Sequence, residues 1–545
     1  MSVKLRRVLL LALVLASLTW SVLQQRSSHA PTASWAVTAV APDVLTLGTL
    51  TLEPCNIGKR GRGVPTLRAY CTAFAVPEDR RQPQGRRIRL RIALVRAAAA
   101  EADPDPVVFL DGGPGGAASE DYPAIAGAFE PLRRRHAVLL IDQRGTGGSN
   151  ALDCGAGDTG GAGDTGGAGD TGRAGDTVGD DATGSDSTGG DAADGAAAPA
   201  ATARALQQLH ACLARLEPRA APQFYATTDA VADLEDVRRA LGAPRLDLIG
   251  VSYGTRVAQQ YARRYPGAVR ALILDSAVPN GLSLGSETAR NLEDTLRALS
   301  ERCRAQRGCA ERFGDPYRTL QRVHARLQAG AQTVELRDPY TFQPQRRTIT
   351  ADSLAELVRL YAYSPYTAAL LPYVLQEADA GRYAALLGQA RIAVGDVEAQ
   401  LNGGMGLSVA CTEDADGLHA DGADAHTVLG DSLTQWLLSA CTVWPHGSRP
   451  ADFGAPLRGA VPVLILAGEL DPVTPPRYGA AILRTLPRGR LLRAAGQGHG
   501  LLGVGCMPRL LSEFIRTLDA AGLDARCLEM LAPTPSFQDA NGAGP

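Results

Sequence analysis

Ser252 lies in the pattern Gly250-Val251-Ser252-Tyr253-Gly254, between a short apolar run and a helical pattern. Residues 246–249 predict a buried strand, and residues 256–264 predict a helix that follows the turn. A serine on such a tight strand-to-helix turn presents its hydroxyl above the sheet, where the glycines allow close backbone approach. The bare pattern is weak in a chain with 60 glycines, where a Gly/Ser loop is the alternative. The prediction that Ser252 is a nucleophile therefore depends on the flanking strand and helix.

Two further side chains fit the partners that a reactive serine requires. An acyl-transfer serine needs a base to take its proton and an acid to orient that base. Asp471 and His499 each follow a predicted strand, and the histidine sits between glycines. The chain order Ser, Asp, His is the one that α/β-hydrolases use. We therefore predict the triad Ser252, Asp471 and His499. Glu469 and Asp275 are the alternative acids, and a surface loop is the alternative setting for the histidine.

Residues 111–116 read Asp-Gly-Gly-Pro-Gly-Gly and follow a predicted buried strand at 107–110. A glycine-rich loop in this position supplies one of the two backbone amides that stabilise the oxyanion in acyl transfer. We predict that the N–H groups of Gly113 and Tyr253 form this oxyanion hole. A phosphate-binding loop is the alternative, but the sequence contains no Gly-Lys-Ser/Thr after these glycines.

The order of the predicted elements indicates an α/β fold with a mostly parallel sheet, the α/β-hydrolase fold. Residues 281–445 are helical in pattern and arginine-rich, without buried-strand runs, which predicts a helical cap inserted between core strands. The remaining core strands are predicted at 88–95, 137–141, 271–274, 461–467 and 491–494, and a helix at 230–241. The predicted divisions are a signal peptide (1–30), the first part of the core (31–280), the cap (281–445), the second part of the core (446–531) and a flexible tail (532–545).

Residues 155–202 interrupt the first part of the core. They repeat Ala-Gly-Asp-Thr-Gly-Gly and then degrade into Gly, Asp, Ala and Ser, with almost no large apolar side chain. Such a segment cannot bury enough apolar surface to offset its ordering entropy, so we predict disorder. Calcium-binding repeats are the alternative, but they are nonapeptides that each carry a large apolar residue, which is missing here.

The N-terminus indicates export. Lys4, Arg6 and Arg7 precede an apolar run from 8 to about 23 and a polar stretch that ends at Ala30. The run is short for a membrane span and is interrupted by polar residues, so a cleaved signal is favoured over an anchor. We expect a secreted, periplasmic or cell-envelope protein without a stable membrane span beyond the signal segment.

Ten cysteines fit an oxidising compartment. Connectivity does not follow from sequence alone, but chain neighbours suggest the pairs Cys55–Cys71, Cys154–Cys212, Cys303–Cys309, Cys411–Cys441 and Cys506–Cys527. Zinc binding is a weak alternative, because no Cys-x-x-Cys occurs. We expect no metal and no cofactor. The net charge of -2 gives no electrostatic reason to expect a nucleic-acid partner.

Several motifs together resemble the exported tripeptidyl aminopeptidase-like branch of the proline iminopeptidase family, which are α/β-hydrolase serine peptidases. The resemblance covers most of residues 50–530 and includes Cys506 and Cys527. Asp111 departs from it, because a histidine opens this loop in proline iminopeptidases. The repeat insert has no counterpart in the family. The motifs that carry the resemblance are Asp111–Gly116, Asp142–Gly147, Gly250–Thr255, Gly468–Asp471 and His499.

The resemblance implies an enzyme that releases residues or short peptides from the free amino end of peptide substrates. It further implies that a carboxylate in Val409–Asp414 binds the substrate's α-ammonium, for which Glu413 is the choice and Asp414 the alternative. A solvated acid of the cap is the alternative for both. A carboxylesterase or lipase with the same triad, and a non-catalytic exported binding protein on a hydrolase scaffold, are the competing functions.

Overall fold

The computed structural model describes residues 38–41, 44–59, 65–99, 103, 105–153, 198–393, 403–539 and 541–542. The predicted signal peptide lies outside these residues, as does the repeat insert up to residue 197. The last residues of the predicted insert are helical, because helix α4 (Ala198–Leu216) already begins there.

Eleven strands of the described chain form one sheet in the order β1-β2-β3-β4-β5-β7-β6-β8-β9-β12-β13. The strands from β7 to β13 in this order are parallel, and those from β1 to β5 form an antiparallel extension that joins the core where β5 pairs with β7. The strands are β1 (Thr38–Ala41), β2 (Val44–Leu47), β3 (Leu50–Ile57), β4 (Leu67–Pro77), β5 (Arg87–Val95), β6 (Val107–Leu110), β7 (Val138–Ile141), β8 (Leu246–Val251), β9 (Val269–Asp275), β12 (Val463–Gly468) and β13 (Gly489–Ala494).

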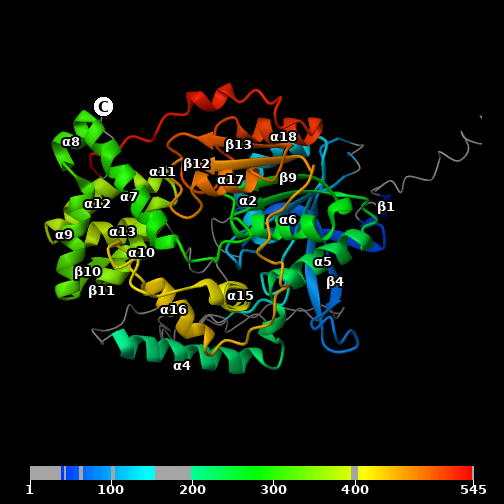
Figure 1. The fold of residues 1–545 in the computed structure, drawn as a ribbon, viewed down its shortest axis with the longest axis horizontal. Coiled ribbons are helices and arrows are strands. Elements are labelled where there is room, and N and C mark those ends of the chain that lie inside the picture. Colours follow the sequence, from blue (N-terminus) through cyan, green and yellow to red (C-terminus); the bar gives the residue numbers. More distant parts are fainter. Residues whose placement is uncertain are drawn as a thin grey trace, which may run out of the picture.

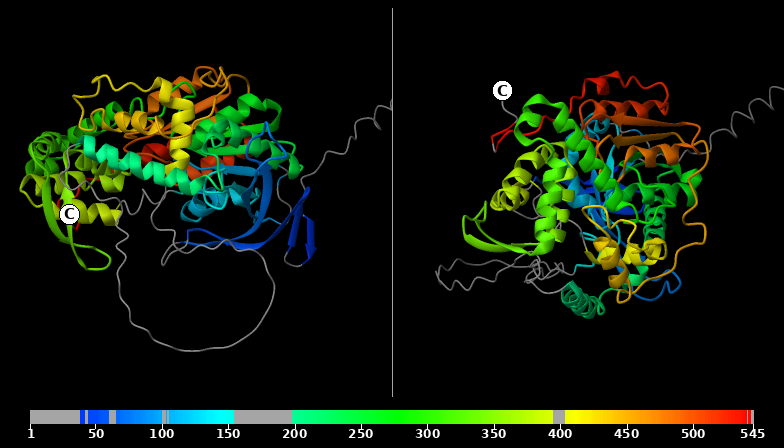
Figure 2. Two further views of the ribbon diagram at one scale, coloured as in Figure 1. Left: turned by 90° about the horizontal axis from the view of Figure 1, so that it is seen from below. Right: turned by 60° about the vertical axis from the view of Figure 1, so that its left-hand side comes forward.

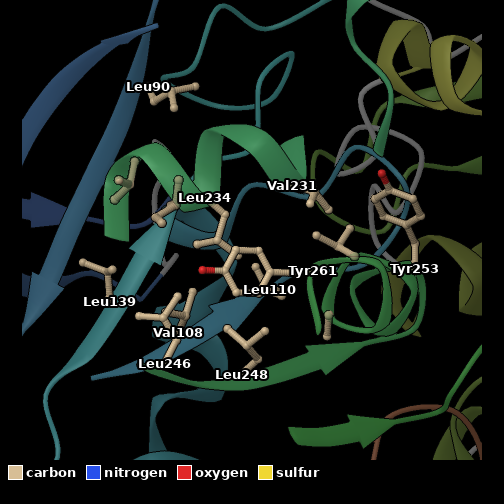
Figure 3. Close-up of a cluster of buried hydrophobic side chains, with 14 of the residues drawn as sticks. Leu90, Val108, Leu110, Leu139, Val231, Leu234, Leu246, Leu248, Tyr253 and Tyr261 are labelled. Atoms are coloured by element: carbon tan, nitrogen blue, oxygen red, sulfur yellow. The ribbon is translucent and has the colours of Figure 1, made fainter. Parts of the chain in front are cut away.

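Helices cover both faces of the sheet, because every core strand is apolar on both sides. Successive residues of a strand point to opposite faces, so β6 directs Val108 and Leu110 to one cluster and Val107 and Phe109 to the other. Figure 3 shows the first cluster, where Leu234 and Tyr261 pack over the strands. The first face is covered by α5 (Thr227–Ala240) and α6 (Tyr253–Arg264), and the second by α2 (Ala118–Ile125), α3 (Glu130–Arg133) and α18 (Met507–Thr517). Helix α17 (Pro476–Leu483) packs on β12 and β13.

The chain leaves the sheet after β9 and returns in β12, which is the parallel neighbour of β9. The segment in between forms a cap with its own apolar cluster, on the left in Figure 1. Its helices are α7 (Thr288–Ala305), α8 (Arg307–Phe313), α9 (Pro316–Ala329), α10 (Ala351–Ala362), α11 (Pro365–Ala368), α12 (Leu371–Asp379), α13 (Ala384–Ala393), α15 (Gly403–Val409) and α16 (Ser432–Cys441). Helix α4 packs against α16 (Figure 2).

The cap also contains a β-hairpin, formed by β10 (Gln332–Arg337) and β11 (Pro344–Ile349). The predicted helical cap thus includes two strands that the sequence pattern did not indicate. The hairpin escaped the sequence pattern because only its base is buried, at Val334 and Ile349, while its other residues are largely exposed. A strand without a continuous apolar face gives no periodic signal.

Four of the suggested disulfides are present: Cys55–Cys71, Cys303–Cys309, Cys411–Cys441 and Cys506–Cys527. Cys212 is disulfide-bonded as well, but its suggested partner Cys154 lies outside the described residues. Cys411–Cys441 ties the end of α16 to the turn that follows α15. Within the described chain, no helix is long and apolar enough to cross a bilayer.

The C-terminal segment lies along the cap. The Phe537 N–H donates to the Ala369 carbonyl at 2.9 Å, and the Phe537 side chain packs against the cap cluster. Pro533 lies against Gly496, which belongs to the loop after β13. The flexibility expected for residues 532–545 stays a prediction.

Gly254 provides a test of the packing between α6 and β6. A Cβ at this position would lie 2.1 Å from the Leu110 carbonyl oxygen, so Gly254→Ala forces the helix away from the strand. We expect a loss of stability of about 1–3 kcal/mol, typical of an overpacked core, measured as a lower midpoint of thermal unfolding. Gly267→Ala is the control, because a Cβ there meets nothing within 4 Å. Equal midpoints for the two variants would contradict this account of the packing.

Candidate active site

The predicted chemical groups follow the carboxyl ends of neighbouring parallel strands. The glycine-rich loop follows β6, Ser252 follows β8, Asp471 follows β12 and His499 follows β13, with β9 between β8 and β12. Since parallel strands end at the same edge of a sheet, residues that are far apart in sequence meet there. This edge is where ligands bind in open α/β sheets.

Ser252 occupies a strained turn between β8 and α6. Its φ of 53° lies in the left-handed region, which non-glycine residues rarely adopt. The turn has no room for side chains on either side, because a Cβ on Gly250 would lie 2.5 Å from the Gly254 carbonyl oxygen. Helix α6 begins at Tyr253, directly after the serine and earlier than the sequence pattern indicated. The geometry is that of a nucleophile elbow.

Asp471 and His499 form a direct pair. The His499 Nδ1 lies 2.9 Å from Oδ2 and 3.0 Å from Oδ1 of Asp471. The carboxylate is fully buried and accepts further hydrogen bonds from the N–H groups of Val473 and Thr474 and from the Thr474 hydroxyl. Because Nδ1 faces the carboxylate, it carries the proton, and Nε2 is left as the basic nitrogen.

The environment shifts the pKa of both groups of this pair, in opposite directions. Burial raises the pKa of Asp471, but the imidazole of His499 and the bonds from Thr474 outweigh it, so the pKa lies below its usual value. Burial lowers the pKa of His499, but the Asp471 carboxylate outweighs this, and the net pKa lies above its usual value. The pair therefore favours an ionised acid that stabilises a protonated base.

The two alternative acids serve the loop that holds His499. The Asp275 carboxylate accepts the N–H groups of Leu501 and Leu502 at 2.7 and 2.9 Å, and is not bonded to the imidazole. The Glu469 carboxylate accepts the Gly496 N–H at 2.7 Å and is more than half exposed. These three bonds orient the backbone around His499, and of the three acids Asp471 is the one bonded to the ring.

The end of β9 also links the histidine loop to the nucleophile. The Ser252 N–H donates to the Asp275 carbonyl at 2.9 Å, and the Gly500 N–H donates to the Ser276 hydroxyl at 2.9 Å. Within the described chain, the Ser252 hydroxyl makes no hydrogen bond, to His499 or to another residue. Catalytic hydrogen bonds of this kind are often long until substrate binds.

The predicted oxyanion amides flank the serine. A Cβ on Gly112 would lie 3.1 Å from the Ser252 Cβ, so the loop after β6 runs directly beside the nucleophile. Within the described residues, the N–H groups of Gly113 and Tyr253 have no acceptor. Tyr253 is the first residue of α6, whose N–H lacks an intrahelical partner. Free amides beside the serine are what a developing oxyanion requires.

Glu413 lies in the interior, within the π-helical turn η4 (Ala410–Asp414). One carboxylate oxygen accepts the Thr227 N–H at 2.5 Å, and the other accepts the Thr227 hydroxyl at 2.8 Å. The Nη1 atom of Arg256 in α6 lies 3.5 Å from Oε2 of Glu413 and 3.0 Å from Oδ2 of Asp414. Burial, helped by the negative charge of Asp414, raises the pKa of Glu413 to about 7, although the Arg256 guanidinium and the Thr227 hydrogen bonds lower it. The alternative, a solvated acid of the cap, is wrong for both Glu413 and Asp414, because both side chains are buried.

Glu413 is linked to the active site by Thr227, which forms hydrogen bonds with both Glu413 and Tyr253. The Thr227 hydroxyl is 2.8 Å from the phenol oxygen of Tyr253, whose backbone N–H is a predicted oxyanion donor. Sequence analysis did not select Thr227 or Thr474 for the site. Thr474 could have been suspected, since it follows Asp471 within Asp-Pro-Val-Thr-Pro, whereas Thr227 carries no local signal.

A hollow lies beside the histidine loop, between helices of the cap and the C-terminal segment. Its walls are mainly apolar and include Leu296, Leu371, Leu470 and Pro533. None of Ser252, Asp471, His499, Gly113 or Tyr253 lines it. The hollow is therefore a neighbour of the candidate active site and not the space above the serine.

Comparison with known proteins agrees with this architecture. Residues 105–307 match the family described as alpha/beta hydrolase fold, and residues 426–527 match the family described as TAP-like protein. The serine protease Hip1 of Mycobacterium tuberculosis is 26% identical over 311 residues, which is 53% of this chain and 59% of that protein. The tripeptidyl aminopeptidase of Streptomyces coelicolor is 26% identical over 340 residues, 57% of this chain and 59% of that protein.

Among solved structures, the proline iminopeptidase of Mycobacterium smegmatis aligns with a TM-score of 0.36 and 15% identity, covering 82% of this chain and 99% of that one. This likeness is too low to support an argument, so the fold assignment depends on the family matches and the sheet. The sheet and the match of residues 105–307 define the class of proteins with an α/β-hydrolase fold. Residues 426–527 are in addition similar to TAP-like proteins, so the two matches fall on the parts of the parallel sheet before and after the cap. The chain spans 59% of the length of each of the two curated relatives.

The His499–Asp471 pair predicts how the reactivity of Ser252 depends on pH. Serine attack needs a neutral imidazole, and the pKa of His499 is raised, so labelling by a fluorophosphonate should decline below a midpoint above pH ~6.5. Asp471→Asn removes the group that raises this pKa, so the midpoint should move to lower pH and the rate should fall by up to about 10⁴-fold. The measurement is the second-order rate constant of labelling, determined at about nine pH values between pH 5 and 9.

Glu469→Gln is the matched control for Asp471→Asn. It changes the neighbouring acid, which is bonded to the Gly496 N–H and not to the ring. Its labelling midpoint should stay at the wild-type value. A midpoint that moves with Glu469→Gln but not with Asp471→Asn would reverse the assignment of the two acids.

Proposed function

We propose that the protein is an exported serine aminopeptidase that releases residues or short peptides from free amino termini through an acyl-enzyme. The observation that carries the proposal is the array at one sheet edge: an elbow serine, a buried carboxylate–imidazole pair and two free backbone amides. Relatives described as serine protease and tripeptidyl aminopeptidase support peptides as the substrate class.

In the proposed mechanism, Nε2 of His499 takes the proton of the Ser252 hydroxyl as the oxygen attacks the scissile carbonyl. The carbonyl oxygen becomes an oxyanion, which accepts hydrogen bonds from the N–H groups of Gly113 and Tyr253. The protonated imidazole, stabilised by Asp471, then gives its proton to the leaving amine. Water, deprotonated by the same imidazole, then attacks the acyl-enzyme. The imidazole returns the proton to the Ser252 oxygen as the acyl bond breaks, which releases the carboxylic acid product and restores the enzyme.

Glu413 is the proposed recognition group for the substrate's α-ammonium. The buried cluster of Arg256, Glu413 and Asp414 contains two acids and one base, so an arriving ammonium would balance its charge. Both Glu413 oxygens already accept hydrogen bonds from Thr227, and the side chain is fully buried. Binding therefore requires that the Thr227–Glu413 contact opens when the amine enters.

Export is proposed from the N-terminal pattern and is supported by the cysteines. Four disulfides link described residues, and none of the described cysteines is free. Disulfides in this number persist in oxidising compartments and are rare in the bacterial or eukaryotic cytosol.

A panel of aminoacyl-, dipeptidyl- and tripeptidyl-anilides, each with a free and a blocked amine, tests the activity. We expect the free-amine anilides to be cleaved and Ser252→Ala to remove this turnover while the midpoint of thermal unfolding is retained. Full activity in Ser252→Ala would refute the triad. Cleavage of a short-chain nitrophenyl ester without any anilide would identify a carboxylesterase, and a wild-type protein that a fluorophosphonate does not label would be a binding protein.

Glu413→Gln tests the recognition of the amine separately. The substitution keeps the size of the side chain and removes its charge, so kcat/KM on free-amine anilides should fall by roughly 10- to 1000-fold, because a charged partner is lost from a desolvated site. Fluorophosphonate labelling, which needs no ammonium group, should change little. Equal losses in both assays would mean that Glu413 supports the elbow and does not bind the substrate.

A further inference from the structure

The cap contacts the proposed catalytic base directly, through the residue that follows helix α10. The backbone N–H of His499 donates a hydrogen bond to the backbone carbonyl of Tyr363 at 2.8 Å. The two rings also meet, with centroids 5.2 Å apart and planes inclined by 68°. An edge-to-face contact at this distance is favourable and restricts rotation of both rings.

The histidine loop is shaped to admit this contact. A Cβ on Gly498 would lie 2.2 Å from the Tyr363 carbonyl oxygen and 3.5 Å from that of Ala362. Only glycine at this position allows the cap backbone to approach so closely. The loop after β13 and the end of α10 are thus fitted to each other at the residue that precedes the base.

Tyr363 is itself held by an ion pair of the cap. The Arg359 Nη1 donates to the Tyr363 hydroxyl at 2.8 Å, and the guanidinium lies 5.4 Å from the centroid of the ring. The Arg359 Nε in turn donates to Glu356 at 2.8 Å. Arg359 therefore contacts the phenol ring of Tyr363 at both its hydroxyl and its face, which orients the ring that packs against the imidazole.

The contact with Tyr363 restricts the orientation of the His499 ring, which the hydrogen bond to Asp471 alone does not fix. Asp471 fixes one ring nitrogen of His499, and the ring can still swing about that hydrogen bond. Tyr363 limits this swing, and so decides where Nε2 points. A displacement of about 1 Å at a catalytic group can lower a rate by about 10²-fold.

We propose that Tyr363, oriented by Arg359, is a positioning residue that holds His499 toward Ser252 and makes the reactivity of the triad depend on the seating of the cap. The proposal goes beyond the proposed function and rests on it for the roles of Ser252 and His499. It assigns to the cap a part in the chemistry in addition to any part in substrate recognition.

The cap contains a matched cluster that does not touch His499. Arg297 donates to the Tyr317 hydroxyl at 2.9 Å, lies 4.3 Å from the centroid of that ring, and pairs with Glu293. Both clusters thus combine a glutamate, an arginine and a tyrosine. Variants at Tyr317 and Arg297 measure what loss of such a cluster does to the stability of the cap.

The test compares Tyr363→Leu and Tyr363→Phe with Tyr317→Leu, using the full chain. The readouts are the second-order constant of fluorophosphonate labelling, kcat and KM on the best anilide, and the midpoint of thermal unfolding. Tyr363→Leu should lower the labelling constant and kcat by roughly 10- to 100-fold, with little change in KM. Tyr363→Phe, which keeps the ring, should retain most of the rate. Tyr317→Leu should label at the wild-type rate.

Arg359→Gln adds a readout that a purely structural role would not move. The groups that face His499 are Asp471 and Asp275, which raise its pKa, and Arg359, which lowers it. Removing the arginine charge should therefore shift the acidic limb of the labelling profile to higher pH. Arg297→Gln, the control in the matched cluster, should leave that limb in place.

Labelling of Tyr363→Leu at the wild-type rate, or slowing equal to that of Tyr317→Leu, would overturn the proposal. An unshifted limb in Arg359→Gln together with labelling at the wild-type rate would overturn the part assigned to the arginine, which is to orient the Tyr363 ring. Labelling needs no peptide, so a wild-type protein that is labelled but cleaves no anilide refutes only the aminopeptidase function. A wild-type protein that is not labelled refutes the proposed function and this proposal together.

Discussion

The backbone at the end of β9 is the constraint on which the candidate active site depends. Asp275 accepts the Ser252 N–H through its carbonyl and two amides of the histidine loop through its carboxylate, while Ser276 accepts a third. One strand end thus sets the distance between the nucleophile turn and the loop of the base. Because β9 lies between β8 and β12 in a parallel sheet, the sheet fixes the position from which the Asp275 and Ser276 side chains reach the histidine loop.

Two groups of buried, ion-paired side chains lie near this edge. Asp471 is paired with His499, and Arg256 of the elbow helix is paired with Glu413 and Asp414 of the cap. A buried charge without a partner would be strongly destabilising, so the pairs of Arg256 with Glu413 and Asp414 also hold the cap in register with the core. The Arg256 cluster and the Tyr363 contact are two separate attachments of the cap, one behind the nucleophile and one behind the base.

Much of the fold could be predicted from sequence because its core strands are short apolar runs bounded by glycine, aspartate or proline. The runs around 107–110 and 246–249 became β6 and β8, and the elbow, the acid and the histidine followed strands as expected. Four cysteine pairs were also correct, since the partners are close in the chain. The cap hairpin was not predictable, because Val334 and Ile349 alone are buried in it and leave no period.

The sequence by itself determined which residues have the chemistry and which strands they follow, because strand periodicity and turn glycines are local properties. Tertiary structure alone decided which acid touches the ring, since Asp471, Glu469 and Asp275 all follow strands and differ only in where their oxygens point. It also decided that Glu413 is buried against Thr227 and Arg256, and that Tyr363 lies on His499. These contacts join segments that are more than a hundred residues apart, and no local pattern encodes such a meeting.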